Sequence, residues 1–593
     1  MLRPEDLFYG TDGKPDAPIV CIGEAWGSEE ALAELAFVGQ SGQLLRQMLR
    51  EADIDPSRVL FTNLVPSQPK KNDFTQFLAP GHGTGTYRGL NPKLELLDGL
   101  RRLYIQITAV PRTLIIACGN YPLWALTSVA SVNKGTEKPR FGDPTPDTPT
   151  GIARYHGSQL WLDPIPGVVY GTLTFPETPV LPLFHPAAIL RDWSLRHTTV
   201  HDLRNRVPRS VPLAKWRDPQ RYTWLAPPTP GEVHHILNYW RITAEAEGGL
   251  TISLDIETKH QSFITCIGLG VGNAPLAISI PFVKIGPDKS FSSFWSASEE
   301  AKILRELAET LHHPKIKILG QNLNYDCQFL WHTMRLKPKV AFDTLIAQNL
   351  LFPGTPKDLA TLSAMYCEYH RYWKDDNREW SDTGTLEQHL RYNCEDVTRT
   401  LEIARAQIAL LVQTGKHHHL AFEMERFELA REMNERGIKR DPKATLRAGA
   451  LIVEEMEQLA TQLRLYVPQS FLPETKAKTT VPWYRSDSQI KFVLYDLLQL
   501  PIQYSRLTGR PSSGKEALHT LATDYPRLRR LFNALLDYGS LDTIYSTFIK
   551  AKLDYGSRMR CSFGNTSTYR WTSSKNAFGR GGNLQNIPVG EDE

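Results

Sequence analysis

The sequence predicts an α/β multidomain protein, and three observations indicate this class. The chain has 593 residues, which is longer than a domain with a single hydrophobic core usually is, so two to four domains are expected. Apolar residues make up 41% of it, which is typical of globular domains rather than of a disordered chain. Short apolar runs alternate with helical patterns before about residue 207, strands and helices continue to about residue 412, and long amphipathic helices follow.

Charge and cysteine content bound the function classes. Lysine plus arginine number 68 and aspartate plus glutamate 64, a balance that argues neither for nor against a nucleic-acid partner. The seven cysteines form no CxxC pair, which argues against a thiolate zinc site and indicates a reducing compartment. The first ten residues hold no apolar signal core, and no run of 18 apolar residues occurs. The sequence therefore predicts a soluble, cytoplasmic chain with no membrane partner.

The N-terminal segment alternates strands and helices. APIVCIG (17–23), RVLFTNL (58–64) and TLIIACG (113–119) are each short and apolar, as buried parallel strands are. GQLLRQMLREA (42–52) has the period of an amphipathic helix. A stretch rich in proline and charge, about 207–230, then marks a boundary.

The middle segment reads as three successive strands followed by helices. The strands are LTISLDIET (250–258), FITCIGLGVG (263–272) and PLAISIPF (275–282), and EEAKILRELAETLHH (299–313) follows as a helix. Two long amphipathic helices, 419–437 and 446–467, are expected after a second boundary near residue 415.

Four acidic residues of the middle segment carry the strongest chemical signal. Asp255 and Glu257 are two apart on a predicted strand, so both carboxylates emerge on one face. Asp326 stands where a strand enters a helix, and Tyr392 and Asp396 are four apart on another helix. Gathered carboxylates repel one another unless divalent cations bind between them, and such oxygen ligands suit Mg²⁺ or Mn²⁺. A pair of such ions can hydrolyse a phosphodiester in line, with the tyrosine orienting the attacking water.

This set closely resembles the DEDD family of 3′→5′ exonucleases, in its tyrosine variant. The acidic residues, Tyr392, and the stretches GQNLNYD around Asn322 and AFDTLIAQNLL around Asp343 occur in the family's order over residues 251–404. The resemblance implies a ribonuclease-H-like fold. It also implies a site in which Asp255, Glu257, Asp326 and Asp396 hold two divalent cations, Tyr392 is catalytic and Asn322 contacts DNA.

The C-terminal segment resembles the thumb and the start of the palm of family A DNA polymerases. MERFELAREMNERGIKRD, SDSQIKFVLYDLLQLP, TGRPSSGKEAL and NTSTYRWTSSKNAFGRGGNLQNIP follow in that family's order. The resemblance implies a mostly helical region whose DNA contacts include the residues Arg570, Asn583, Gln585 and Asn586. The palm motif DxSxxExR, which follows NLQNIP in the family, is not in the chain. Polymerisation is therefore expected to need a part that this chain lacks, either further sequence or a second chain with palm and fingers.

The N-terminal segment resembles the uracil-DNA glycosylase superfamily, closest to its family 4 type, over residues 18–203. Its GEAWG, FVGQSGQLL, a strand ending in Asn, and HPA match family positions. The resemblance implies an α/β/α domain that flips a nucleotide, with a uracil pocket formed by Glu24, Phe37, Asn63 and His185. Family 4 members hold an iron–sulfur cluster on four cysteines. Cys21 and Cys118 do not reproduce that spacing, so no cluster is expected.

The sequence thus predicts four parts: a glycosylase-like domain (1–206), a linker and entry helix (207–245), an exonuclease domain (246–412), and a polymerase thumb with the beginning of a palm (413–593). The leading interpretation is a proofreading 3′→5′ exonuclease within a phage-type family A polymerase, acting on single-stranded 3′ ends and primer–template duplex in a host cytoplasm. The alternatives are a uracil-DNA glycosylase fused to a nuclease, or a non-catalytic DNA-binding half of a split polymerase.

Overall fold

The computed structural model describes most of the chain. The described residues are 7–80, 87–135, 145–164, 177–207, 216, 222–272, 275–286, 288, 290–375, 385–468, 471–472, 481–506, 508–566 and 568–587. Contacts divide the chain into two units: one of residues 1–259, 264–323 and 336–424, the other of residues 260–263, 324–335 and 425–593. Much of the predicted linker, 208–215 and 217–221, lies outside the described residues.

The first sheet of the larger unit has the strand order β2-β1-β3-β7-β6. Its first four strands are parallel and β6 is antiparallel to β7. The bounds are β1 Ile19–Ala25, β2 Val59–Val65, β3 Leu114–Cys118, β6 Leu160–Trp161 and β7 Pro179–Leu183. All residues of β2, β3 and β7 are buried, which fits their largely apolar sequences. The three predicted strands are confirmed as β1, β2 and β3.

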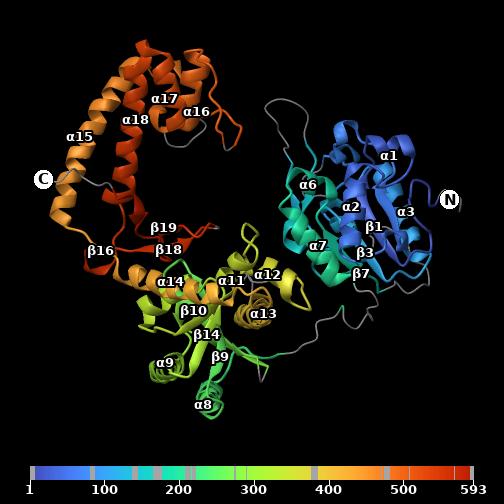
Figure 1. The fold of residues 1–593 in the computed structure, drawn as a ribbon, viewed down its shortest axis with the longest axis horizontal. Coiled ribbons are helices and arrows are strands. Elements are labelled where there is room, and N and C mark those ends of the chain that lie inside the picture. Colours follow the sequence, from blue (N-terminus) through green and yellow to red (C-terminus); the bar gives the residue numbers. More distant parts are fainter. Residues whose placement is uncertain are drawn as a thin grey trace. The chain divides into compact units, whose positions relative to one another are not determined.

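Two hydrophobic cores lie on opposite faces of this sheet. Val20 and Ile22 of β1 pack in one core with α3 (Leu94–Thr108) and α4 (Asn120–Leu126), and Cys21 packs in the other with α2 (Gln40–Glu51) and α7 (Leu195–Arg206). The alternation along β1 is that of a strand between two helical layers. Figure 1 shows α2 and α7 on one side of the sheet and α3 on the other. The α/β/α prediction is confirmed, including the helix at 42–52.

Shorter elements complete this domain. They are α1 (Ser28–Ala33), β4 (Ser131–Asn133), β5 (Thr148–Thr150), α5 (Ile152–Tyr155) and α6 (Pro186–Arg191). His185 caps α6, because its Nδ1 accepts from the Ala187 amide at 3.2 Å and Pro186 stands at the first helical position.

The second sheet of this unit is mixed, with the strand order β15-β14-β9-β10-β11-β8. β9 pairs parallel with β14 and β10 pairs antiparallel with β11. The bounds are β8 Thr223–Leu225, β9 Leu250–Lys259, β10 Phe263–Val271, β11 Leu276–Pro281, β14 Ile316–Gly320 and β15 Val340–Asp343. The three predicted strands are confirmed as β9, β10 and β11. A small hairpin of β12 (Val283–Ile285) and β13 (Phe291–Ser293) follows β11.

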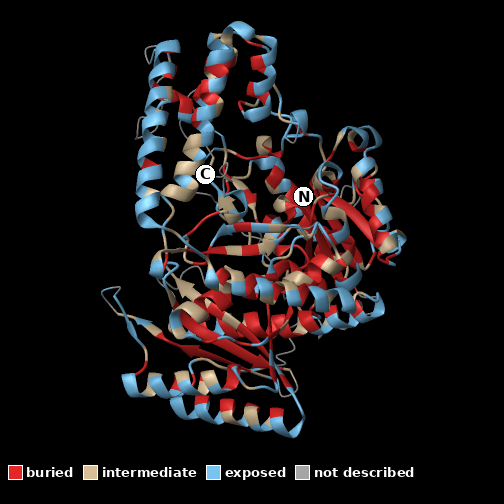
Figure 2. Cartoon of the chain, turned by 60° about the vertical axis from the view of Figure 1, so that its left-hand side comes forward, coloured by how far each residue is buried: buried red, intermediate tan, exposed pale blue. Residues whose placement is uncertain are grey.

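Helices cover both faces of the mixed sheet. Figure 1 shows α8 and α9 on one side and α11, α12 and α13 on the other. Their bounds are α8 Pro230–Ala246, α9 Ala297–Leu311, α11 Thr344–Leu351, α12 Leu359–Tyr366 and α13 Leu386–Gln413. Thr385 and Gln388 form a capping box that starts α13, which then crosses β9, β11 and β14. Figure 2 shows the buried residues following the strands of the sheets.

The smaller unit is mostly helical, as predicted. Its elements include most of α10 (Leu323–Phe329) and α14 (His417–Arg436), then α15 (Pro442–Tyr466), α16 (Asp487–Lys491), α17 (Lys515–Asp524) and α18 (Arg529–Ile544), with β16 (Ile438–Lys439), β17 (Arg558–Met559), β18 (Cys561–Asn565) and β19 (Trp571–Lys575). α15 and α18 contribute to one core around Trp483 and Phe532. In α10, Asn324 donates to the Phe563 carbonyl at 2.8 Å. No helix among the described residues combines the length and apolar character needed to cross a bilayer.

Candidate active sites

The strand β9 presents two carboxylates on one face. Ile252, Leu254 and Ile256 are buried, while Asp255 and Glu257 are half-buried. Because side chains alternate along a strand, the three apolar residues share one face and the two acids share the other. The alternation that the DxE spacing predicted is therefore present.

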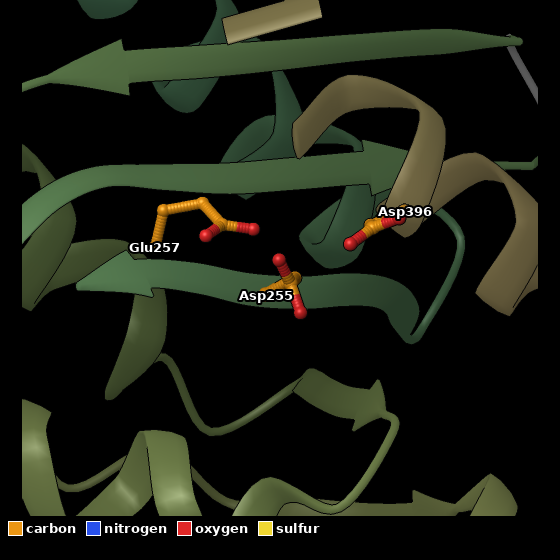
Figure 3. A group of neighbouring side chains, drawn as sticks. All are labelled: Asp255, Glu257 and Asp396. Atoms are coloured by element: carbon orange, nitrogen blue, oxygen red, sulfur yellow. The ribbon is translucent and has the colours of Figure 1, made fainter. Parts of the chain in front are cut away.

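Asp396 of α13 joins these two acids. One ligand atom from each of Asp255, Glu257 and Asp396 lies within 4.8 Å of the others. Figure 3 shows the three carboxylates turned toward a common space, two from β9 and one from the helix. Among the described residues, this is the one group of three or more histidine, cysteine or acidic side chains spaced to hold a metal ion.

The donor chemistry of this group fits a hard divalent cation. Three carboxylates at such spacing repel one another, and hard oxygen ligands are those that Mg²⁺ and Mn²⁺ prefer. No histidine or cysteine belongs to the group, so nothing in it favours a softer metal. Asp255, Glu257 and Asp396 are therefore the residues that would hold the predicted cations.

Asn393 orients Asp255 from α13, one turn before Asp396. Its Nδ2 donates to Asp255 Oδ2 at 2.8 Å, and its Oδ1 accepts from the Ser279 hydroxyl at 2.8 Å. Asn393 is fully buried. Gly268 of β10 leaves space for the Asn393 side chain, since a Cβ there would lie 2.4 Å from Asn393 Oδ1. The sequence interpretation missed Asn393; its signal was a polar residue at a core position of the YNCED helix.

Trp373 and Lys374, which precede α13 in the chain, both contact the Asp396 carboxylate. The Trp373 indole donates to Asp396 Oδ1 at 2.6 Å, and the Lys374 ammonium lies 2.6 Å from Asp396 Oδ2. Burial lowers the pKa of Lys374, but Asp396, Tyr392 and Asp255 outweigh it and raise that pKa overall. An ionised carboxylate has about four lone-pair sites, so Asp396 can accept both bonds and still coordinate a cation. Neither residue was predicted, and no local periodicity marks them.

Tyr392 lies one helical turn before Asp396, as the i, i+4 spacing predicted. The Lys374 ammonium sits 4.9 Å from the centre of its ring. Burial, then the charge of Asp396, raises the pKa of the Tyr392 hydroxyl well above its usual value, so the phenol is protonated at neutral pH.

The fourth predicted ligand, Asp326, is not among the three residues of this group. It is buried on α10, in the smaller unit. The start of α10 is fixed by Asp343, whose carboxylate accepts from the amides of Asn322 and Leu323 at 3.2 and 2.8 Å. The backbone of Asn322 has the left-handed conformation at this point, with φ of 55°. The roles of Asp326 as a ligand and of Asn322 in DNA contact stay predictions.

The predicted uracil pocket lies where parallel strands of the first sheet end. Glu24 belongs to β1 and Asn63 to β2, and His185 follows β7. A Cβ on Gly119, after β3, would lie 2.7 Å from Glu24 Oε1 and 3.3 Å from His185 Cβ. A Cβ on Gly23 would lie 2.7 Å from the Phe37 ring and 3.0 Å from Asn63 Oδ1. The four predicted residues therefore gather in two pairs around two glycines at the carboxyl edge of the sheet, where ligands of α/β folds bind.

Burial tunes the titratable groups of this pocket. It raises the pKa of Glu24 to about 7 and lowers the pKa of His185 to about 4. His185 is thus neutral at pH 7, and because its Nδ1 accepts a hydrogen bond, its proton stands on Nε2 as a donor. Asn63 Oδ1 is buried with no hydrogen-bond partner among the described residues. A base with a donor on its edge would satisfy that oxygen.

The predicted duplex-contacting residues are accessible. Arg570, Gln585 and Asn586 are exposed, and Asn583 is half-buried with its side chain accepting from the Gln585 amide at 3.0 Å. Cys21 and Cys118, the two cysteines of the N-terminal domain, are buried on neighbouring strands with their Sγ atoms 3.5 Å apart.

Comparisons with known proteins bear on these sites. Residues 11–206 match the model of the uracil DNA glycosylase superfamily, and residues 283–407 match a 3′-5′ exonuclease model. The second match includes Asp326, Tyr392 and Asp396 but begins after Asp255 and Glu257.

Two individual proteins are also similar. The type-4 uracil-DNA glycosylase of Thermotoga maritima is 39% identical over 61 residues, 10% of this chain, so the chain spans about a third (32%) of that relative's length. The solved POL domain of Pol1 from M. smegmatis, in complex with DNA primer-template and dNTP, is 18% identical with a TM-score of 0.43, covering 61% of this chain and 56% of that one. The family matches are the stronger findings: the chain carries a domain of the uracil-DNA glycosylase superfamily, followed by a 3′-5′ exonuclease domain.

Proposed function

We propose that the chain hydrolyses DNA from its 3′ end at the site of Asp255, Glu257 and Asp396. The observation that carries this is the convergence of three carboxylates within 4.8 Å in a domain that matches the 3′-5′ exonucleases. Divalent cations bound there would polarise the scissile phosphate and make water a nucleophile at neutral pH. Asp326 is proposed as the fourth ligand.

The chain's own residues would position the reactants. Asn393 fixes Asp255, and Trp373 fixes Asp396, so two ligands are oriented before any cation binds. Tyr392 keeps its proton and can direct a water by hydrogen bonding from one turn away. We infer that the phosphate oxygens and the terminal base are held without sequence preference, by backbone contacts and stacking as in other proteins that bind single strands. We propose that the exposed Arg570, Gln585 and Asn586 contact duplex DNA.

The decisive experiment is degradation of DNA labelled at its 5′ end in the presence of Mg²⁺ or Mn²⁺. We expect a ladder that shortens from the 3′ end, and none with a blocked 3′ terminus. The double variant Asp255→Asn/Glu257→Gln, which keeps the side-chain size, should lose the activity. Glu309→Gln, at a half-exposed acid (52% exposed) paired with Arg241, is the matched control and should keep it. A ladder of equal rate from the double variant would place the activity elsewhere.

A second candidate function is excision of uracil by the N-terminal domain. The observation that favours it is the buried Asn63 Oδ1 beside Phe37, which no group of the described residues hydrogen-bonds, with neutral His185 and Glu24 at the same sheet edge. Asn63 would accept from the uracil N3–H, Phe37 would stack on the base, and His185 would donate to its developing negative charge. Water would add to C1′ as the glycosidic bond breaks and uracil leaves with the electron pair.

The test uses the nuclease-deficient Asp255→Asn/Glu257→Gln background, so that strand shortening does not mask base loss. Uracil-containing and thymine-containing oligonucleotides are incubated and then cleaved with alkali. We expect breaks at uracil alone, and none when Asn63→Leu is added. Absence of uracil-specific breaks from the background protein would refute excision, and retained binding of the uracil strand would then indicate a recognition module.

A further inference from the structure

A segment without regular structure contacts both the N-terminal domain and the acidic group of the larger unit. It runs from Cys367 to Asp375, between the end of α12 and the undescribed residues 376–384. Such a segment has no ladder of its own to fix it, so its path depends on contacts with its neighbours.

The glycosylase-superfamily domain holds the beginning of this segment and the end of α12 just before it. Arg206, at the end of α7, is 2% exposed, and its guanidinium donates to the carbonyls of Ala364 and Glu368 at 2.8 and 2.6 Å. Gln159 and His370 form two hydrogen bonds with each other. The Gln159 backbone N–H donates to the His370 carbonyl at 2.7 Å, and the Gln159 side-chain Oε1 accepts from the His370 backbone N–H at 3.0 Å. A buried guanidinium is costly unless satisfied, so these carbonyls are strongly preferred partners.

The same domain holds the far end of the segment. The Tyr372 amide donates to Ser158 Oγ at 3.2 Å, and its ring lies 5.1 Å from that of Tyr155. Arg154 pairs with Asp375 at 2.5 Å. These contacts stand immediately on either side of the two residues that reach the nuclease site.

The side chains of Trp373 and Lys374 contact the acidic group of the exonuclease domain instead. Between Tyr372 and Asp375, Trp373 and Lys374 both contact the carboxylate of Asp396. Partners that orient a metal-binding carboxylate typically change metal affinity or activity about ten- to hundredfold when removed. The placement of Trp373 and Lys374 therefore bears on the nuclease, and the N-terminal domain sets that placement.

We propose that the glycosylase-superfamily domain acts as a positioning element of the exonuclease: it clamps residues 364–375 so that Trp373 and Lys374 hold Asp396 in its metal-binding orientation. This inference rests on the proposed nuclease function. It assigns the N-terminal domain a role that does not require it to excise a base.

A charge-swap series in the full-length chain tests the clamp. Arg154→Asp places like charges against Asp375, and Arg154→Asp/Asp375→Arg restores an ion pair of reversed sense. Arg46→Asp is the matched control, because Arg46 is similarly exposed (21% against 23%) and pairs with Asp12 inside the N-terminal domain. Trp373→Phe tests the nuclease end, since it keeps an aromatic side chain but removes the N–H that donates to Asp396.

Three readouts are taken: hydrogen exchange of the peptide covering 364–375, Mn²⁺ binding by calorimetry without DNA, and the rate of 3′-end shortening. We expect Arg154→Asp to speed exchange in that peptide and to weaken Mn²⁺ binding and slow shortening about three- to tenfold. The swapped pair should recover at least half of each loss, and Arg46→Asp should change none. Trp373→Phe should weaken Mn²⁺ binding about ten- to hundredfold without faster exchange.

The outcomes separate this inference from the proposed function. Faster exchange with unchanged Mn²⁺ binding in Arg154→Asp would overturn the clamp, as would equal losses in Arg46→Asp. Unchanged Mn²⁺ binding in Trp373→Phe would overturn the positioning of Asp396. A wild-type chain that binds Mn²⁺ with these dependences but shortens no DNA would refute the nuclease function and leave the clamp supported.

Discussion

Replacement of Asn393 by leucine tests how the proposed nuclease site is organised. The substitution keeps the approximate volume and suits a helix, but it removes the amide that donates to Asp255 Oδ2 at 2.8 Å. The bond is to a charged group, and partners of this kind typically change metal affinity about ten- to hundredfold. We therefore expect the Mn²⁺ concentration for half-maximal 3′-end shortening to rise by that factor, or roughly 1.4 to 2.8 kcal/mol.

A second substitution separates this effect from loss of stability. Asn393→Leu leaves the buried Ser279 hydroxyl without the acceptor that it has at 2.8 Å, at a cost of about 1 to 3 kcal/mol in unfolding free energy. Adding Ser279→Ala should recover much of that stability but none of the Mn²⁺ affinity. Mn²⁺ titrations of the single and double variants, with thermal unfolding in parallel, measure both. An Mn²⁺ dependence equal to wild type in a folded Asn393→Leu protein would refute the assigned role of Asn393.

Three further predictions follow from buried groups. Gly268→Ala should displace the Asn393 amide, because the new Cβ would lie 2.4 Å from its Oδ1, and Mn²⁺ titration should show weaker binding than wild type. Burial raises the pKa of Glu24 to about 7, so the folded state binds a proton more tightly than the unfolded state and loses stability as pH rises through 7. Glu24→Gln should therefore unfold at a higher temperature than wild type at pH 8.5 and at nearly the same temperature at pH 5. Calorimetry at both pH values checks this. Asp343→Asn replaces one of the two oxygens that accept the Asn322 and Leu323 backbone N–H groups with an NH₂ group, which cannot accept, so the variant should unfold at a lower temperature than wild type. If Asp326 on the same helix is a ligand, the variant should also shorten DNA more slowly.

Local patterns were sufficient to predict the elements and part of the site. Short, largely apolar runs marked β1, β2 and β3 because both faces of that sheet are covered, and helical periodicity marked α2, α9 and α15. The two-residue spacing of Asp255 and Glu257 sufficed to predict their shared face, because alternation along a strand is a local property.

Residues brought in by long-range contacts could not be predicted in the same way. Trp373 and Lys374 reach Asp396 from more than 20 positions upstream, on a segment with no periodicity. Arg206 meets carbonyls more than 150 residues away, and nothing in its own helix indicates them. Asn393 carried a weak local signal, a polar side chain at a buried helical position, but its partner depends on how α13 crosses the sheet.

Crystals soaked in MnCl₂ test the central claim most directly, since anomalous scattering locates manganese independently of any reaction. We expect Mn²⁺ among the carboxylates of Asp255, Glu257 and Asp396, at about 2.1 Å from oxygens of at least two of them. The same map reports whether Asp326 joins them. A fully occupied manganese site elsewhere, with these three carboxylates bound only to protein groups at saturating Mn²⁺, would contradict the account.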